Sequence, residues 1–170
     1  MRRVVDYRAR NCLTISNKDP LPIISKLLDK TRGGIWFTRL DLKNGFYLIG
    51  VAVGHEWKTG FRTKKGLFPY IGMQFALTNA PATCQKMLDT IFKDEEGSVW
   101  YIDDTLIYGG QTEAEHQAYV ETILPQSVNH GLAVNLTKSE FHVHETIFLV
   151  HIVNDSQVQM DPAKLETMSK

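Results

Sequence analysis

The stretch VWYIDDTLIYGG, residues 99–110, places two adjacent carboxylates, Asp103 and Asp104, inside an otherwise apolar run. The residues on either side of the pair are mostly β-branched, aromatic or aliphatic, which predicts two strands joined by a turn at the acids. Burying an ionised carboxylate without a partner is so costly that the group usually neutralises instead. The pair therefore requires water or a cation, and a hairpin tip at the edge of a sheet exposes it to both.

A third acid, Asp41, lies between Leu40 and Leu42 in the stretch TRLDLKNGF. In a strand the two leucines share one face and Asp41 takes the other. If this strand neighbours the hairpin in one antiparallel sheet, Asp41, Asp103 and Asp104 converge into one cluster. Such a cluster suits Mg²⁺, and Mn²⁺ is also possible, because hard divalent ions prefer oxygen ligands. An exposed Asp-Asp turn with a salt-bridged Asp41 is the structural alternative.

Helix patterns occur in three parts of the chain. Apolar residues recur at helical spacing, with capping or terminating residues, within 19–34, 78–94 and 112–124. The third segment begins with a capping box from Thr112 to Glu115. We expect this helix to run until Pro125 interferes, with Gly131 as its terminator.

Strand patterns fill most of the remaining chain. Residues 35–53 are rich in aromatic and β-branched side chains with Asn44-Gly45 between them, which predicts a strand, a turn and a second strand. Short strands are predicted at 131–136, 141–144 and 146–153. The order of helices and hairpins predicts an α+β fold in which an antiparallel sheet packs against helices, in one domain over residues 1–170.

The composition limits the classes of protein that the chain can represent. Its 170 residues, 43% hydrophobic and 22% charged, are typical of one globular domain. The 19 basic and 19 acidic residues cancel, so nucleic-acid binding must come from local basic clusters, as in MRRVVDYRAR and KTGFRTKKG. Cys12 and Cys84 are too few for a disulfide framework. With no signal peptide or membrane-spanning stretch in the sequence, we expect an intracellular protein of the cytoplasm or nucleus.

Eight stretches of the sequence, in order, resemble the reverse transcriptases of gypsy-type long-terminal-repeat retrotransposons. They are VDYRARN, DPLPIISKLLD, FTRLDLKNGFYLI, WKTGFRTKKG, FALTNAPATCQ, YIDDTLIY, VNLTKSEF and FLVHIV. The resemblance implies a right-hand polymerase, of which the chain holds the palm and part of the fingers. The thumb, the connection and the ribonuclease H are expected to be absent from residues 1–170.

The resemblance also implies an activity and a set of roles. The activity is that of an RNA-directed DNA polymerase, with two-metal transfer from deoxynucleoside triphosphates to a primer on an RNA or DNA template. It implies that Phe46 is a steric gate that excludes a ribose 2′-hydroxyl. The other implied roles are metal binding by Asp41, Asp103 and Asp104, proton donation to pyrophosphate by Lys138, triphosphate binding by Lys58, Arg62 and Lys64, and contact beneath the nascent base pair by Phe75 and Gln85.

Four positions depart from the family pattern. Gln74 and Ala76 replace a proline and a glycine, Val150 replaces a glycine, and Pro125 lies in a helix that the family keeps unbroken. If the family glycine at position 76 needs a positive φ, alanine costs about 1 kcal/mol or more. These departures favour the alternative of a catalytically degenerate domain that binds nucleic acid or protein. A two-metal nuclease or phosphatase is a further alternative, and the sequence leaves the oligomeric state open.

Overall fold

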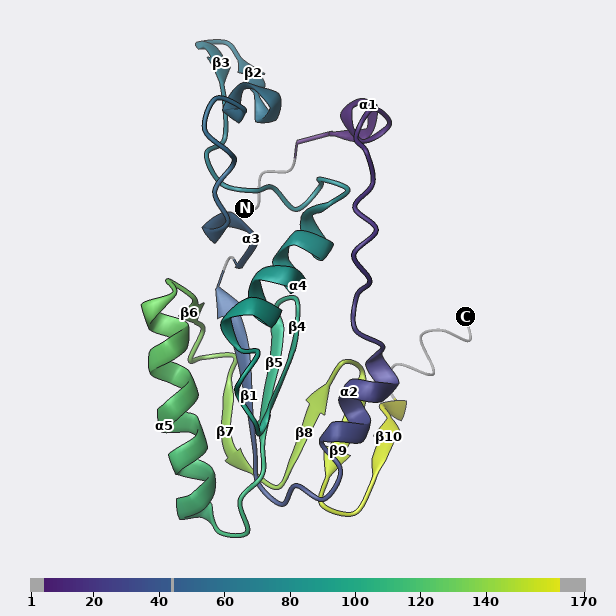
Figure 1. Ribbon diagram of the computed structural model, residues 1–170, viewed down its shortest axis with the longest axis vertical. Coiled ribbons are helices and arrows are strands. Elements are labelled where there is room, and N and C mark those ends of the chain that lie inside the picture. Colours follow the sequence, from purple (N-terminus) through teal and green to yellow (C-terminus); the bar gives the residue numbers. More distant parts are fainter. Residues whose placement is uncertain (1–4, 44, 163–170) are drawn as a thin grey trace.

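The computed structural model describes residues 5–43 and 45–162. Its centre is a five-stranded antiparallel sheet in which β4, β5, β1 and β6 lie in this order and β7 also pairs with β1 (Figure 1). The bounds of these strands are Phe37–Lys43 for β1, Ser98–Tyr101 for β4, Asp104–Tyr108 for β5, Ala133–Val134 for β6 and Glu140–Val143 for β7. The predicted hairpin around Asp103 and Asp104 is therefore confirmed.

The two faces of this sheet bury separate hydrophobic clusters. Leu40 and Leu42 of β1 face helices α4 (Ala80–Ile91) and α5 (Glu113–Asn129). Phe37 of the same strand faces α2 (Ile24–Lys30) and the three-stranded sheet formed by β8, β9 and β10. This division follows from the period of two along a strand. The predicted α+β fold, an antiparallel sheet packed against helices, is confirmed.

The helices agree with their sequence patterns except at Pro125. Helices α2 and α4 lie inside 19–34 and 78–94, and α5 begins with the predicted capping box. The prediction that α5 runs only until Pro125 is wrong, because the helix continues to Asn129. Pro125 is exposed, while Ile123 and Ser127 on either side of it are buried. This burial offsets the cost of about 3 kcal/mol for an interior proline. Among the described residues, no helix is long and apolar enough to cross a bilayer.

The predicted strand–turn–strand over 35–53 is wrong in its second half. Strand β1 is followed by a helical turn, α3 (Gly45–Leu48), and beyond it only an isolated bridge joins Gly50 to Gly72. The ring of Phe46 is buried in the α4–α5 cluster, and this packing overrides the β-propensity of the stretch. Asn44 lies outside the described residues.

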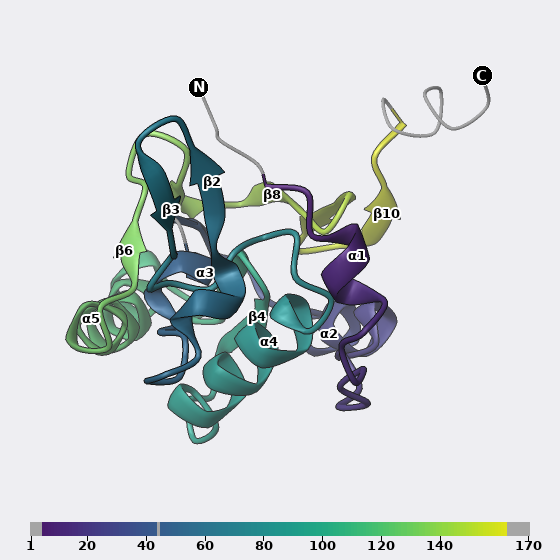
Figure 2. The ribbon, with the colours of Figure 1, turned by 90° about the horizontal axis from the view of Figure 1, so that it is seen from above.

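Four short elements complete the part of the chain between the N-terminus and α4. They are α1 (Arg8–Asn11), the 3₁₀-helix η1 (Glu56–Thr59), β2 (Phe61–Thr63) and β3 (Gly66–Phe68). Strands β2 and β3 form a separate hairpin beyond α3, at one end of the molecule (Figures 1 and 2).

The predicted strand at 146–153 is divided in two. It forms β8 (Glu145–Phe148) and β9 (His151–Asn154), and β9 then pairs with β10 (Val158–Met160). The turn between β8 and β9 holds Leu149 at φ 47° and Val150 at φ 69°. Ala76, in contrast, is not among the described residues with positive φ, so its replacement of the family glycine causes no left-handed strain.

We predict that Val150→Gly stabilises the protein by about 1 kcal/mol, because a β-branched residue in the left-handed region is strained and glycine is not. Val150 is 40% exposed, so little packing is lost. Urea denaturation measures the change. The control is Val128→Gly on the exposed face of α5, which should cost about 0.5 kcal/mol through helix propensity. Loss of stability in Val150→Gly would contradict the strain argument.

Candidate active site

The register of β1 and β5 places Asp41 directly opposite Asp104. Residues that oppose each other in an antiparallel pair point to the same side of the sheet. The main chain of Asp41 pairs with β5 and also makes hydrogen bonds to the segment before β7. Its carbonyl accepts from the Asn135 amide at 2.8 Å, and its amide donates to Ser139 Oγ at 3.1 Å. Two separate parts of the chain therefore fix Asp41 next to Asp104.

The electrostatics of this pair favour a bound cation. Partial burial raises the pKa of Asp104, the nearby charge of Asp41 raises it further, and the charge of Arg39 opposes both. Lys138 Nζ lies 4.0 Å from Asp41 Oδ2. The two carboxylates and Lys138 line one cavity of about 380 Å³. The donor set consists of carboxylate oxygens, which are the ligands that a hard divalent ion prefers.

Asp103 is not among the residues that line the cavity of Asp41 and Asp104. A Cβ atom added to Gly45 would lie 3.0 Å from Asp103 Oδ1. Burial, followed by the negative charge of Asp103, raises the pKa of the Cys84 thiol to about 11. Within 5–43 and 45–162, no group of three or more His, Cys, Asp or Glu side chains is arranged to hold a metal. The structure therefore brings together Asp41 and Asp104, and the carboxylate of Asp103 lies beside Gly45 and Cys84.

The two aromatic residues predicted to face the nucleotide contact each other. The ring centroids of Phe46 and Phe75 are 4.5 Å apart, with an interplanar angle of 50°. Phe46 is 5% exposed, and Phe75 is half-buried against the same cluster. Phe46 follows Gly45 in α3, so its position is tied to the glycine beside Asp103.

The predicted triphosphate-binding residues do not line the cavity of Asp41 and Asp104. Lys58, Arg62 and Lys64 are exposed and belong to η1, β2 and the β2–β3 turn. Of the N-terminal basic cluster, Arg2 and Arg3 lie outside the described residues, and Arg8 forms an ion pair with Asp6 at 2.6 Å. Among the described residues, Lys58 of η1 and Arg62 and Lys64 of the β2–β3 hairpin are thus exposed cations close together in the sequence.

Arg39 is a site residue that the sequence analysis missed. Its guanidinium bonds Glu140 Oε1 at 3.1 Å and the carbonyl of Ile147 at 3.0 Å. It lies two residues before Asp41 on the same strand, so the period of two indicates a shared face. The spacing of two residues between Arg39 and Asp41 is the signal in the sequence that indicates Arg39. A cation on the same face as two carboxylates limits their mutual repulsion.

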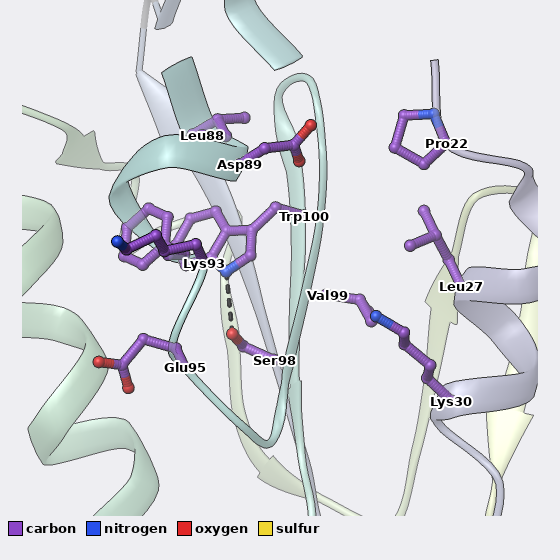
Figure 3. Close-up of a pocket in the computed structure, with 11 residues that line it drawn as sticks. Pro22, Leu27, Lys30, Leu88, Asp89, Lys93, Glu95, Ser98, Val99 and Trp100 are labelled. Atoms are coloured by element: carbon purple, nitrogen blue, oxygen red, sulfur yellow. Dashed lines mark hydrogen bonds between the residues drawn. The ribbon is translucent and has the colours of Figure 1, made fainter. Parts of the chain in front are cut away.

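A second cavity, of about 310 Å³, lies between α2, α4 and β4 (Figure 3). The Trp100 indole is part of its wall and donates to Ser98 Oγ at 2.9 Å. Lys30, the last residue of α2, and Lys93, in the turn after α4, both line it. None of the predicted site residues lines this cavity, which therefore adds nothing to the acidic site.

We predict that Asp104→Asn stabilises the metal-free protein at neutral pH. The pKa of Asp104 is higher in the folded protein than in the unfolded chain, so its ionised form opposes folding. We expect a gain of less than about 1 kcal/mol, because Asp104 is only partly shielded and water still screens its charge. The gain should disappear as the pH falls below the unfolded value of 3.8, where both states bind the proton.

Urea denaturation in EDTA at neutral and acidic pH tests this prediction. Asp155→Asn is the control, because its carboxylate lies in a surface turn and accepts from Ser156 Oγ. Equal stabilities of Asp104→Asn and the wild type at neutral pH would show that the folded protein does not disfavour the ionised form of Asp104.

Known proteins are similar in sequence to this chain over most of its length. Residues 1–159 match the family described as reverse transcriptase (RNA-dependent DNA polymerase). The Transposon Tf2-3 polyprotein of Schizosaccharomyces pombe is 38% identical over 157 residues, which are 91% of this chain and 12% of that polyprotein. The Transposon Tf2-7 polyprotein of the same yeast is 37% identical over the same length. The chain thus spans a small part of these relatives, and the predicted resemblance to retrotransposon reverse transcriptases is confirmed.

Solved structures share the fold. The foamy viral protease-reverse transcriptase in complex with double-stranded DNA has a TM-score of 0.90 at 21% identity, over 99% of this chain and 30% of that one. Its complex with an RNA/DNA hybrid has a TM-score of 0.87 at 21% identity, over 98% of this chain and 23% of that one. The family match over residues 1–159 and the 38% identity to the polyprotein show that the chain belongs to the reverse transcriptase (RNA-dependent DNA polymerase) family.

Proposed function

We propose that the chain is the palm and part of the fingers of an RNA-directed DNA polymerase. The reaction is transfer of a nucleotide from a deoxynucleoside triphosphate to the 3′-hydroxyl of a primer on an RNA or DNA template. The observation that carries the proposal is the pairing of Asp41 with Asp104 next to the Asp103 turn. Carboxylates placed side by side repel each other, and a bound cation relieves that repulsion, which favours catalysis over a purely structural role.

The site residues have separate roles in this proposal. Asp41, Asp103 and Asp104 would hold Mg²⁺ or Mn²⁺ through carboxylate oxygens. Two such ions, when bound, supply Lewis acidity to the attacking and leaving oxygens of the phosphoryl transfer. Lys138, whose Nζ lies 4.0 Å from Asp41 Oδ2, would carry the proton that the departing pyrophosphate needs. Phe46, packed on Phe75, would present a rigid ring to the sugar.

The β2–β3 hairpin supplies the positive charge for polyanionic partners. Arg62 and Lys64 are exposed there and Lys58 is exposed in the preceding η1, and charge-assisted hydrogen bonds to phosphate oxygens are strong. Relatives of the same fold are described in complex with double-stranded DNA and with an RNA/DNA hybrid. These observations support a primer–template duplex and a deoxynucleoside triphosphate as the partners of this chain.

Primer extension by the 170-residue chain tests the proposed function. The reaction contains a labelled DNA primer on an RNA template, deoxynucleoside triphosphates and Mg²⁺, with EDTA in a parallel reaction. We expect additions of a few nucleotides that EDTA abolishes. Short products are expected because the basic residues of one hairpin make few phosphate contacts, so the duplex dissociates readily. Binding of the duplex without any extension would favour the degenerate binding module instead.

A further inference from the structure

Gln85 of α4 is placed to control the turn that carries Asp103. We propose that Gln85 is a positioning residue, which holds the Ile102–Asp103 turn in the conformation needed for metal binding. The inference rests on the proposed function, because it assumes that Asp103 is a metal ligand. Gln85 then supports the metal site through contacts within the protein, whereas the family resemblance implied a contact beneath the nascent base pair.

The amide oxygen of Gln85 and both of its amide hydrogens make hydrogen bonds within the protein. Gln85 is 2% exposed, and its Oε1 accepts from the Ile102 amide at 3.0 Å. Its Nε2 donates to the Trp100 carbonyl at 3.1 Å and to Asp89 Oδ1 at 2.8 Å. A glutamine amide carries one oxygen acceptor and two donor hydrogens. Both donor hydrogens are therefore occupied, and they are not available to a nucleotide or a template base.

The turn that Gln85 contacts has an unfavourable backbone. Ile102 has φ 54°, and a β-branched residue avoids the left-handed region. On the far side of the turn, the Leu42 amide donates to the Asp103 carbonyl at 3.3 Å. The chain is thus held before Asp103 by α4 and after it by β1. Without Gln85, Ile102 would relax towards negative φ and turn the Asp103 carboxylate away.

Asp89 lies one helical turn after Gln85 in α4, and it orients the Gln85 amide. Figure 3 shows Asp89 and Trp100 on the wall of the second cavity. Asp89 Oδ1 and the Trp100 carbonyl both accept from Gln85 Nε2. Both acceptors bind Nε2, so they fix which end of the amide is oxygen. The Asp89 contact therefore makes the acceptor face Ile102.

Mn²⁺ binding by the full chain, followed by electron paramagnetic resonance, tests the proposal without requiring activity. In Gln85→Met, which is similar in length but cannot make these hydrogen bonds, we expect affinity to fall about tenfold, as for other supporting contacts of metal ligands. The matched control is Gln117→Met, because Gln117 makes the same kind of bond to Glu121 four residues on, at 2.7 Å, on exposed α5. Its Mn²⁺ affinity should equal that of the wild type.

Circular dichroism at the titration temperature establishes that each variant is folded. If Gln85→Met does not fold, Gln85→Glu replaces it, because a carboxylate cannot donate to Trp100 and is repelled by Asp89, so its oxygen is no longer held against the Ile102 amide. A positioning role predicts weaker Mn²⁺ binding in Gln85→Glu, whereas the added negative charge alone predicts tighter binding. Affinity equal to or above that of the wild type in the folded Gln85 variant overturns the inference.

Steady-state kinetics separate positioning from direct contact with the nucleotide. Positioning predicts a lower kcat with little change in the KM for deoxynucleoside triphosphate, whereas lost nucleotide contact raises KM. A raised KM with unchanged kcat overturns the inference. Failure of the wild-type chain to bind Mn²⁺ overturns both the inference and the proposed function. Normal wild-type binding with no loss in the Gln85 variant overturns the inference alone.

Discussion

Replacement of Asp103 by Asn is expected to reduce Mg²⁺-dependent primer extension by about a thousandfold or more, which corresponds to about 4 kcal/mol of transition-state stabilisation. Asn has nearly the same shape as Asp, so the bonds of Gln85 to Ile102 and of Leu42 to the Asp103 carbonyl should persist. The change removes a negative charge and an oxygen ligand. The loss should therefore appear in catalysis and metal affinity, with the fold retained.

Two measurements test the Asp103 prediction. Primer extension gives the rate, and calorimetric titration with Mg²⁺ or Mn²⁺ gives metal affinity. Asp94→Asn is the matched control, since Asp94 is exposed and ion-paired with Lys93 at 3.6 Å. This control should extend primers like the wild type. Identical isotherms for Asp103→Asn and the wild type, or extension within tenfold of the wild-type rate, would remove Asp103 from the metal site.

Replacement of Phe46 by Ala is expected to raise ribonucleotide incorporation relative to deoxynucleotide incorporation by about tenfold to a hundredfold. The Phe46 ring is held by Phe75 at 4.5 Å and by burial in the α4–α5 cluster, so it cannot move aside for a 2′-hydroxyl. Alanine removes the obstacle. The quantity to measure is the ratio of kcat/KM for the two nucleotides.

The Phe46 variant also loses core packing, by about 3–5 kcal/mol for a buried Phe→Ala change. Phe92→Ala is the matched control, because Phe92 is equally buried in the same cluster and stacks on Trp100 at 3.6 Å. It should lower stability without changing the nucleotide ratio. An unchanged ratio in active Phe46→Ala, or an equal change in Phe92→Ala, would show that Phe46 does not act as a gate.

The elements that could be predicted from the sequence depend on neighbouring residues. The capping box at Thr112 and Glu115, the apolar spacing of α4 and the two strands around Asp103 each follow from a contiguous pattern. The α+β class followed from the order of these patterns. Local patterns failed where packing acted against them. Helix α5 continues through Pro125, and the buried Phe46 lies in the helical turn α3 where the sequence pattern predicted a strand.

The sequence by itself determined the family, the three candidate metal ligands and the strands that carry them. Only the tertiary structure decided how those ligands meet, because a register between residues more than 60 positions apart is set by packing of whole layers. That register pairs Asp41 with Asp104 and leaves Asp103 beside Gly45 and Cys84. Likewise, no local pattern reveals that Gln85 is buried with its amide turned to Ile102, since burial depends on residues from distant segments.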